Sequence, residues 1–146
     1  MRKGFSLITA IVFMILVATL GALALSLSTT SVKQTSDLYL REQAEILVQS
    51  ATEYALLAIS GHTRTTDCLN HIDTNFTNGA NGLFDINISL YYIGSGLSTL
   101  NCNRFSDDNI STSESNLTVI IDTIVTSTSG VSTEPIRLHR RTIQKP

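Results

Sequence analysis

The sequence predicts an α+β protein with one long N-terminal helix, whose first half spans a membrane and whose second half packs on a small antiparallel sheet. Three observations predict this fold class. The 29 residues between Lys3 and Lys33 include no charged side chain. Apolar side chains then recur at helical spacings of three and four, and in the second half of the chain apolar and polar residues alternate.

The composition excludes some classes of protein. The chain has 146 residues, enough for one modest domain besides the helix. Its 42% hydrophobic and 15% charged residues are unevenly distributed, because everything after the apolar segment is rich in Ser, Thr and Asn. This distribution predicts a membrane-anchored protein and not a soluble enzyme. A net charge of −2 argues against a dedicated nucleic-acid-binding protein, so no nucleic-acid partner is expected.

The apolar segment from Phe5 to Leu27 is long enough to cross a bilayer, because its 23 residues span about 34 Å as a helix. Arg2 and Lys3 precede it, which predicts a single-pass protein with its N-terminus in the cytoplasm. The alternative is a cleaved export signal, which has a shorter apolar region and a structural break. Residues 25–49 contain neither Gly nor Pro, so a helix is able to continue.

Beyond the membrane segment the pattern becomes amphipathic. Polar residues such as Arg41 and Glu45 fall between apolar positions spaced for one helical face. One helix from Phe5 to Ile59 is predicted, with Gly61 as its stop. The alternative is a break at residues 28–31 and a separate second helix. The apolar positions are Leu40, Ala44, Leu47, Val48, Ala51, Ala55 and Ala58.

The rest of the chain is predicted to be a polar loop followed by strands. Residues 84–92 alternate between apolar and polar side chains, as expected for a half-buried strand. Residues 117–125 form a second predicted strand, and residues 136–143 a third that is more polar. A short sheet of these strands on the amphipathic half of the helix buries both apolar faces.

The N-terminus resembles the precursors of type IV filament subunits, meaning the pilins and the pseudopilins of type II secretion. The resemblance covers residues 1–60. It implies a prepilin leader at residues 1–4, a helix at 5–60, a small β-rich head at 61–146 and a pilin-like fold. It also implies cleavage between Gly4 and Phe5 and N-methylation of Phe5. The residues that carry the resemblance are Met1-Arg2-Lys3, Gly4 and Phe5-Ser6-Leu7-Ile8.

The resemblance further implies where the protein works and what it contacts. The expected location is the bacterial inner membrane, with the head in the periplasm, and later a filament or pseudopilus. The expected partners are other pilins or pseudopilins, the prepilin peptidase, the inner-membrane assembly platform and the membrane itself. A bitopic membrane protein unrelated to filaments is the remaining alternative.

The chain departs from the family at one position. The family usually has glutamate as the fifth mature residue, and here that residue is Thr9. The glutamate is thought to attract the N-terminal amine of a neighbouring subunit, and an unpaired ammonium in apolar surroundings is costly. A subunit that enters first does not need this acid. We therefore predict a minor subunit that primes assembly or occupies the tip, with an ordinary minor subunit or a major pilin as alternatives.

The two cysteines, Cys68 and Cys102, lie in the extracytoplasmic part, where a disulfide is favoured. Closing this loop contributes about 3 to 4 kcal/mol in the chain-entropy model. The alternatives are zinc bound by both cysteines with His62 and His71, and calcium at Asp107-Asp108-Asn109. Neither set has a ligand spacing typical of its metal, so no metal or cofactor is expected.

No enzyme is predicted, because nucleophilic catalysis needs a base beside a nucleophile and no motif indicates one. The C-terminus instead carries a basic stripe. Its simplest interpretation is a solvated edge strand that charge protects from aggregation. The alternatives are contact with anionic lipid headgroups or with DNA phosphates, as in a competence-type minor pilin. The basic stripe consists of Arg137, His139, Arg140, Arg141 and Lys145.

Every Asn-x-Ser/Thr site in the chain has an acidic residue two positions earlier. The sites are Asn75, Asn87, Asn109 and Asn116, and the acids are Asp73, Asp85, Asp107 and Glu114. Since only 12 of 146 residues are acidic, random placement does not explain the pattern. It resembles the extended site of some bacterial periplasmic oligosaccharyltransferases. N-glycosylation is predicted at loop sites Asn75, Asn109 and Asn116, whereas Asn87 lies inside a predicted strand.

Overall fold

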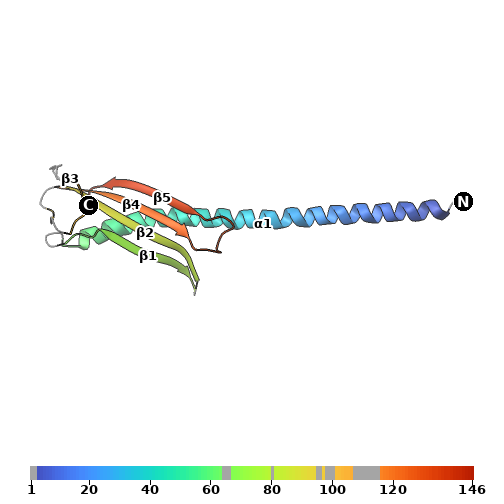
Figure 1. Ribbon diagram of the computed structural model, residues 1–146, viewed down its shortest axis with the longest axis horizontal. Coiled ribbons are helices and arrows are strands. Elements are labelled where there is room, and N and C mark those ends of the chain that lie inside the picture. The colour runs from blue at the N-terminus through green and yellow to red at the C-terminus, as the bar shows by residue number, and fades with distance from the viewer. Residues whose placement is uncertain (1–2, 64–66, 80, 95–96, 98–100, 107–115) are drawn as a thin grey trace. The chain divides into compact units, whose positions relative to one another are not determined.

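The computed structural model describes residues 3–63, 67–79, 81–94, 97, 101–106 and 116–146, with helix side chains from residue 7 onward. These described residues form one helix and five strands (Figure 1). The chain divides into two compact units, Met1–Leu38 and Tyr39–Pro146. The elements are α1 (Lys3–Gly61), β1 (His71–Asn78), β2 (Asn81–Gly94), β3 (Arg104–Ser106), β4 (Leu117–Ser127) and β5 (Arg137–Gln144).

Helix α1 is continuous through the Ser/Thr-rich segment, so the alternative of two separate helices is wrong. The threonine hydroxyl groups there donate hydrogen bonds to backbone carbonyls of the same helix. Thr29 Oγ1 donates to the carbonyl of Ser26 at 2.9 Å, and Thr30 Oγ1 donates to that of Leu27 at 2.9 Å. Because a backbone carbonyl oxygen has two lone pairs, it is able to accept a hydroxyl in addition to the helical N–H.

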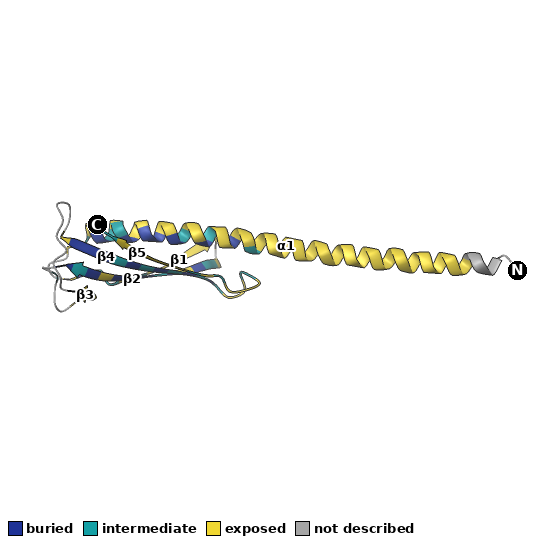
Figure 2. Cartoon of the chain, turned by 90° about the horizontal axis from the view of Figure 1, so that it is seen from above, coloured by how far each residue is buried: buried dark blue, intermediate teal, exposed yellow. Residues whose placement is uncertain are grey.

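The first unit is an exposed apolar helix. Its large hydrophobic side chains from Leu7 to Val32 are 49–75% exposed, and none of the residues in its most apolar stretch is buried (Figure 2). Mean hydropathy reaches 2.6 there, and the helix is long and apolar enough to cross a membrane. The sequence prediction of an N-terminal apolar helix is therefore confirmed.

In the second unit, four strands form an antiparallel sheet in the order β1-β2-β4-β5. The short β3 runs parallel to β2 and pairs with it at Tyr92 and Ile93, beyond the end of β1. The predicted strands at 84–92, 117–125 and 136–143 correspond to β2, β4 and β5. The prediction of a loop before β2 is wrong over residues 71–78, because this segment pairs with β2 as β1.

The core lies between the second half of α1 and one face of the sheet (Figure 2). Ala44 and Ala55 are fully buried in it, and Leu40, Val48 and Ile59 of the same helix face are also buried. Opposite them lie buried apolar residues of β2 and β4, which alternate with more exposed, outward-facing residues of mixed polarity. The α+β prediction is confirmed. The sheet contributes Phe84, Ile86, Ile88, Leu90, Tyr92, Leu117, Val119, Ile121 and Val125.

A disulfide joins Cys68 to Cys102, as predicted, with the Cα atoms 4.9 Å apart. It ties the segment after α1 to the segment before β3. Asn70 reinforces the link, because its side chain donates to the carbonyl of Asn101 at 2.8 Å and accepts from the backbone N–H of Asn103 at 2.8 Å. Both cysteines are thus occupied by a covalent bond, and the alternative zinc site is wrong.

Candidate functional site

Two exposed surfaces are candidates for function, one because it is apolar and the other because it carries clusters of charged and polar side chains. One is the apolar surface of α1 up to Leu38, and the other is the face of the sheet that points away from α1. We call the second surface the outer face. It consists of the alternate side chains of β1, β2, β4 and β5 that do not contribute to the core.

The apolar surface of α1 includes the N-terminal residues that the sequence singled out. The Gly4–Phe5 bond lies in the first turns of the helix, and Thr9 follows as an exposed residue. Polar side chains on this surface are compatible with lipid, since Thr19 Oγ1 donates to the carbonyl of Leu16 at 2.9 Å. A contiguous apolar surface of this kind requires lipid or other apolar helices around it.

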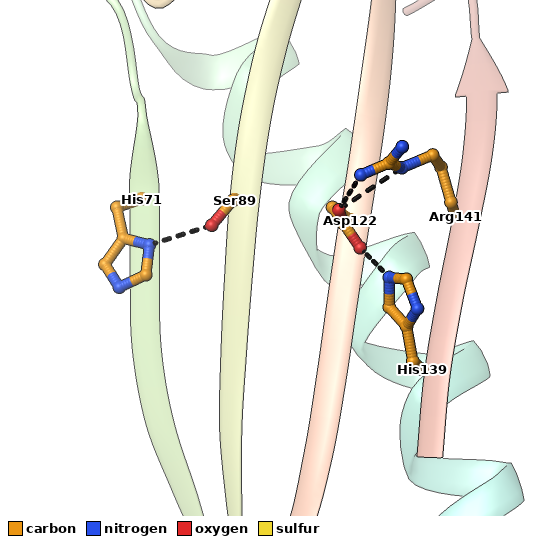
Figure 3. A network of polar contacts seen from close by, with 5 residues as sticks. All are labelled: His71, Ser89, Asp122, His139 and Arg141. Atoms are coloured by element: carbon orange, nitrogen blue, oxygen red, sulfur yellow. Dashed lines mark hydrogen bonds and ion pairs between the residues drawn. The ribbon is translucent and has the colours of Figure 1, made fainter.

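The outer face is polar in its middle. Strand pairing aligns His71, Ser89, Asp122 and Arg141 in one row across β1, β2, β4 and β5. His139 lies two residues from Arg141 on the same side of β5, and Figure 3 shows both side chains turned toward Asp122. The sheet therefore places one carboxylate between two basic side chains.

Asp122 is the centre of this cluster. Arg141 donates to Asp122 Oδ2 through Nε at 3.2 Å and through Nη2 at 2.5 Å, and His139 Nε2 contacts Oδ1 (Figure 3). The Asp122 side chain is only 13% exposed, whereas Arg141 is 62% exposed. Partial burial by itself favours the protonated carboxyl, but the hydrogen bonds and charges of Arg141 and His139 outweigh it and lower the pKa of Asp122.

The alternation of β5 removes one residue, Arg140, from the predicted basic stripe and leaves Arg137, His139 and Arg141 on the outer face. Arg141 and His139 are engaged with Asp122, and Arg140 pairs with Thr123 on the opposite side of the strand. β5 is an edge strand of the sheet, in agreement with the solvated-edge interpretation. The five basic residues therefore do not form one uniform phosphate-binding surface, and the DNA-binding alternative gains no support from this geometry.

A second polar cluster joins β1 to β2. His71 Nε2 lies 2.8 Å from Asp73 Oδ2, and Ser89 Oγ lies 3.5 Å from His71 Nδ1 (Figure 3). Asn87 Nδ2 donates to Asp73 Oδ1 at 2.8 Å. Serine, histidine and aspartate stand here in the order of a catalytic triad. The His71 and Asp73 side chains are 44% and 68% exposed, and in such water-accessible surroundings their electrostatic coupling is weak. We interpret the cluster as a cross-strand polar contact.

The remaining predicted sites are placed as follows. Asn75 is exposed but lies in β1, so its prediction as a loop residue is wrong. Asn87 is half-buried in β2, as predicted for a strand residue, and Asn116 is exposed just before β4. Asp107, Asp108 and Asn109, the predicted alternative calcium site and one predicted glycosylation site, lie outside the described residues. Among the residues that the structure describes, no three His, Cys, Asp or Glu side chains are grouped to hold a metal.

Comparisons of the chain with models of protein families, with curated proteins and with solved structures found no match. The architecture itself, an apolar N-terminal helix that continues onto a small antiparallel sheet with a disulfide, is consistent with a pilin-like fold.

Proposed function

We propose that the protein is a minor subunit of a type IV filament or of a type II secretion pseudopilus, and that it primes assembly or occupies the tip. The observation that supports this most is the division of α1 into two chemically different halves. One half exposes a continuous apolar surface, and the other half supplies the core of the head. A processed filament subunit needs both halves in one helix.

The two halves support successive stages of such a role. Before assembly, the apolar half stores the subunit in the membrane, because lipid covers its side chains. During assembly, neighbouring apolar helices replace the lipid by packing against the same side chains. The head remains outside the membrane and supplies the contacts with partners. Thr9 restricts the subunit to a position where no neighbouring amine needs a carboxylate.

The experiment that tests this proposal is a processing assay on the full chain in bacterial membranes that contain an active prepilin peptidase. We expect the intact mass to lose residues 1–4 and to gain one methyl group on Phe5. Gly4→Leu places a bulky side chain at the cleaved bond, so this variant is expected to keep its full length. The matched control is Gly21→Leu on the same helix, where an added Cβ meets no atom within 4 Å. This control is expected to be processed normally.

Two results would contradict the proposal. One is a native chain that keeps Met1 while another prepilin in the same membranes is cleaved. The other is a head released from α1, because that result would indicate an ordinary export signal.

A further inference from the structure

We propose that Asn75, on the edge strand β1, is an acceptor site for N-linked glycosylation by a transferase that requires an acidic residue two positions before the asparagine. This inference depends on export of the head and not on its assembly into a filament. Its ligand class is an oligosaccharide carried on a lipid pyrophosphate.

The sequence contains an internal control for the acidic pattern. Four asparagines have Ser or Thr two positions later, and each of them has Asp or Glu two positions earlier. Five other asparagines lack the hydroxyl residue, and none of these has the acid. The acid therefore accompanies the acceptor motif specifically and does not reflect a general pairing of Asn with Asp in turns. The five are Asn70, Asn78, Asn81, Asn101 and Asn103.

The structure makes the Asn75 side chain accessible. Among the strands that the structure describes, β1 pairs with β2 alone, so none of them covers its other edge. Residues Asp73, Asn75 and Thr77 are all exposed, and the spacing of two directs Asp73 and Asn75 to one side, whereas the register with β2 shifts between Phe76 and Thr77. A shallow hollow of about 530 Å³ lies beside them, lined by residues 73–75 and 85–87. A transferase is thus able to reach the Asn75 amide, whereas recognition of the Asp73 carboxylate requires it to release its contacts with Asn87 and His71.

Asn87 has the same motif but a different environment. β2 is paired on both sides, with β1 and with β4, so this acceptor lies inside the sheet. The Asn87 Nδ2 atom, which is the atom that would be glycosylated, donates to Asp73 Oδ1 at 2.8 Å and lies 3.2 Å from His71 Nε2. Asn87 is also half-buried. In the folded head, only Asn75 of these two strand sites is available.

The reaction is a substitution at the anomeric carbon of the first sugar. A bond forms between Asn75 Nδ2 and this carbon, and the bond from the carbon to the pyrophosphate oxygen breaks. The amide nitrogen loses one proton to the transferase, and the lipid pyrophosphate leaves with the electron pair. No oxidant or reductant is required.

The test uses the full chain, produced in bacteria with and without a periplasmic oligosaccharyltransferase of the acid-requiring type and its lipid-linked heptasaccharide. Intact mass and glycopeptide mass spectrometry locate the sugar. The variants are Asn75→Gln and Asp73→Asn, with Asn87→Gln and Asp85→Asn as matched controls on the neighbouring strand. Detection of the Cys68–Cys102 disulfide in the same sample establishes that the head was exported.

We expect heptasaccharide on Asn75 in the native chain and in both controls, and none on Asn75 in either test variant. Asn87 is expected to remain unmodified throughout. An exported, disulfide-bonded chain without sugar on Asn75 would overturn the proposal. Sugar on Asn87 as well as on Asn75 would support Asn75 as an acceptor but overturn its selection by the exposed edge strand, because modification would then precede folding.

Discussion

The carboxylate of Asp122 links β4 to β5, because Arg141 and His139 both contact it from the edge strand. Asp122→Asn removes the charge and leaves two basic side chains facing each other. We expect this variant to lower the free energy of unfolding by about 1.5–3 kcal/mol, the range for a lost hydrogen bond to a charged group. Chemical denaturation of the full chain in detergent, followed by circular dichroism, measures the change.

The matched control is Asp73→Asn on β1. Asp73 is 68% exposed, compared with 13% for Asp122. Its ion pair with His71 is therefore expected to contribute less than about 1 kcal/mol. Equal losses of unfolding free energy in Asp122→Asn and Asp73→Asn would show that the deeper burial of Asp122 does not strengthen its contacts.

Because the pKa of the Asp122 carboxyl is lowered in the folded state, we expect the stability of the head to depend on pH. Arg141 and His139 lower the pKa of Asp122 below its ordinary value of 3.8. The folded state therefore binds this proton less readily than the unfolded state, and the resulting stabilisation is present above pH 3.8. It is lost as the pH falls through the lowered pKa. The difference in unfolding free energy between the native chain and Asp122→Asn should thus become smaller in acid. A difference that stays constant down to pH 2 would contradict this pH dependence.

The sequence indicated the polar character of the outer face but not its contacts. Alternation along residues 117–125 places Asp122 opposite the core side, and this is visible without a structure. Its pairing with Arg141 depends on the register between β4 and β5, which a connection of nine residues leaves open. The basic stripe was therefore predicted as one feature, although the strand turns Arg140 to the opposite side and pairs Arg141 and His139 with Asp122.

Helix α1 buries small side chains as well as larger ones against the sheet, and the contact at the small ones is sensitive to added volume. Ala55 is fully buried, whereas Leu57, two residues later, is 70% exposed. Ala55→Leu is expected to destabilise the head by about 1–3 kcal/mol, because a packed core does not accept three extra carbon atoms without strain. Leu57→Ala on the exposed side is the control and should change the stability by less than about 0.5 kcal/mol. Denaturation of both full-length variants in detergent checks this expectation.

The disulfide constrains the segment between α1 and β3. Cys68→Ala with Cys102→Ala opens a loop with a sequence separation of 34 residues. We expect the double variant to be less stable by about 3 to 4 kcal/mol, because the unfolded chain gains conformational freedom. Thermal unfolding with and without reductant measures this. Reductant should lower the unfolding temperature of the native chain to near that of the double variant and leave the unfolding temperature of the double variant unchanged. A native chain whose unfolding temperature does not change on complete reduction would refute the expectation.

Secondary structure was predictable wherever one periodicity dominated. Residues 40–59 have a clear helical face, and residues 84–92 alternate strictly, so α1 and β2 follow from the pattern. β1 was missed because its segment, HIDTNFTN, is rich in Asn, Asp and Thr and is exposed on both sides for most of its length. Its strand conformation depends on pairing with β2, which local propensity does not encode. Gly79, at φ +69°, follows β1 and permits the turn toward β2.

The proposed function raises the question of how many copies of the chain enter one filament. A subunit that repeats throughout a filament places each N-terminal amine near a neighbouring helix, and an unpaired ammonium in an apolar environment costs several kcal/mol. Thr9 supplies a hydroxyl and no charge. The proposed role at the tip follows, because a first subunit has no preceding amine to neutralise.

Introducing an acid in place of Thr9 should allow the subunit to occupy positions other than the tip. In filaments or pseudopili purified from cells, we expect Thr9→Glu to raise the amount of this subunit relative to the major subunit, as measured by quantitative mass spectrometry. Thr9→Gln has nearly the same size and no charge, so it should leave the ratio at the native value. If both variants give the same ratio, the missing carboxylate does not set the copy number, and the head of the subunit must instead determine its position through contacts with its partners.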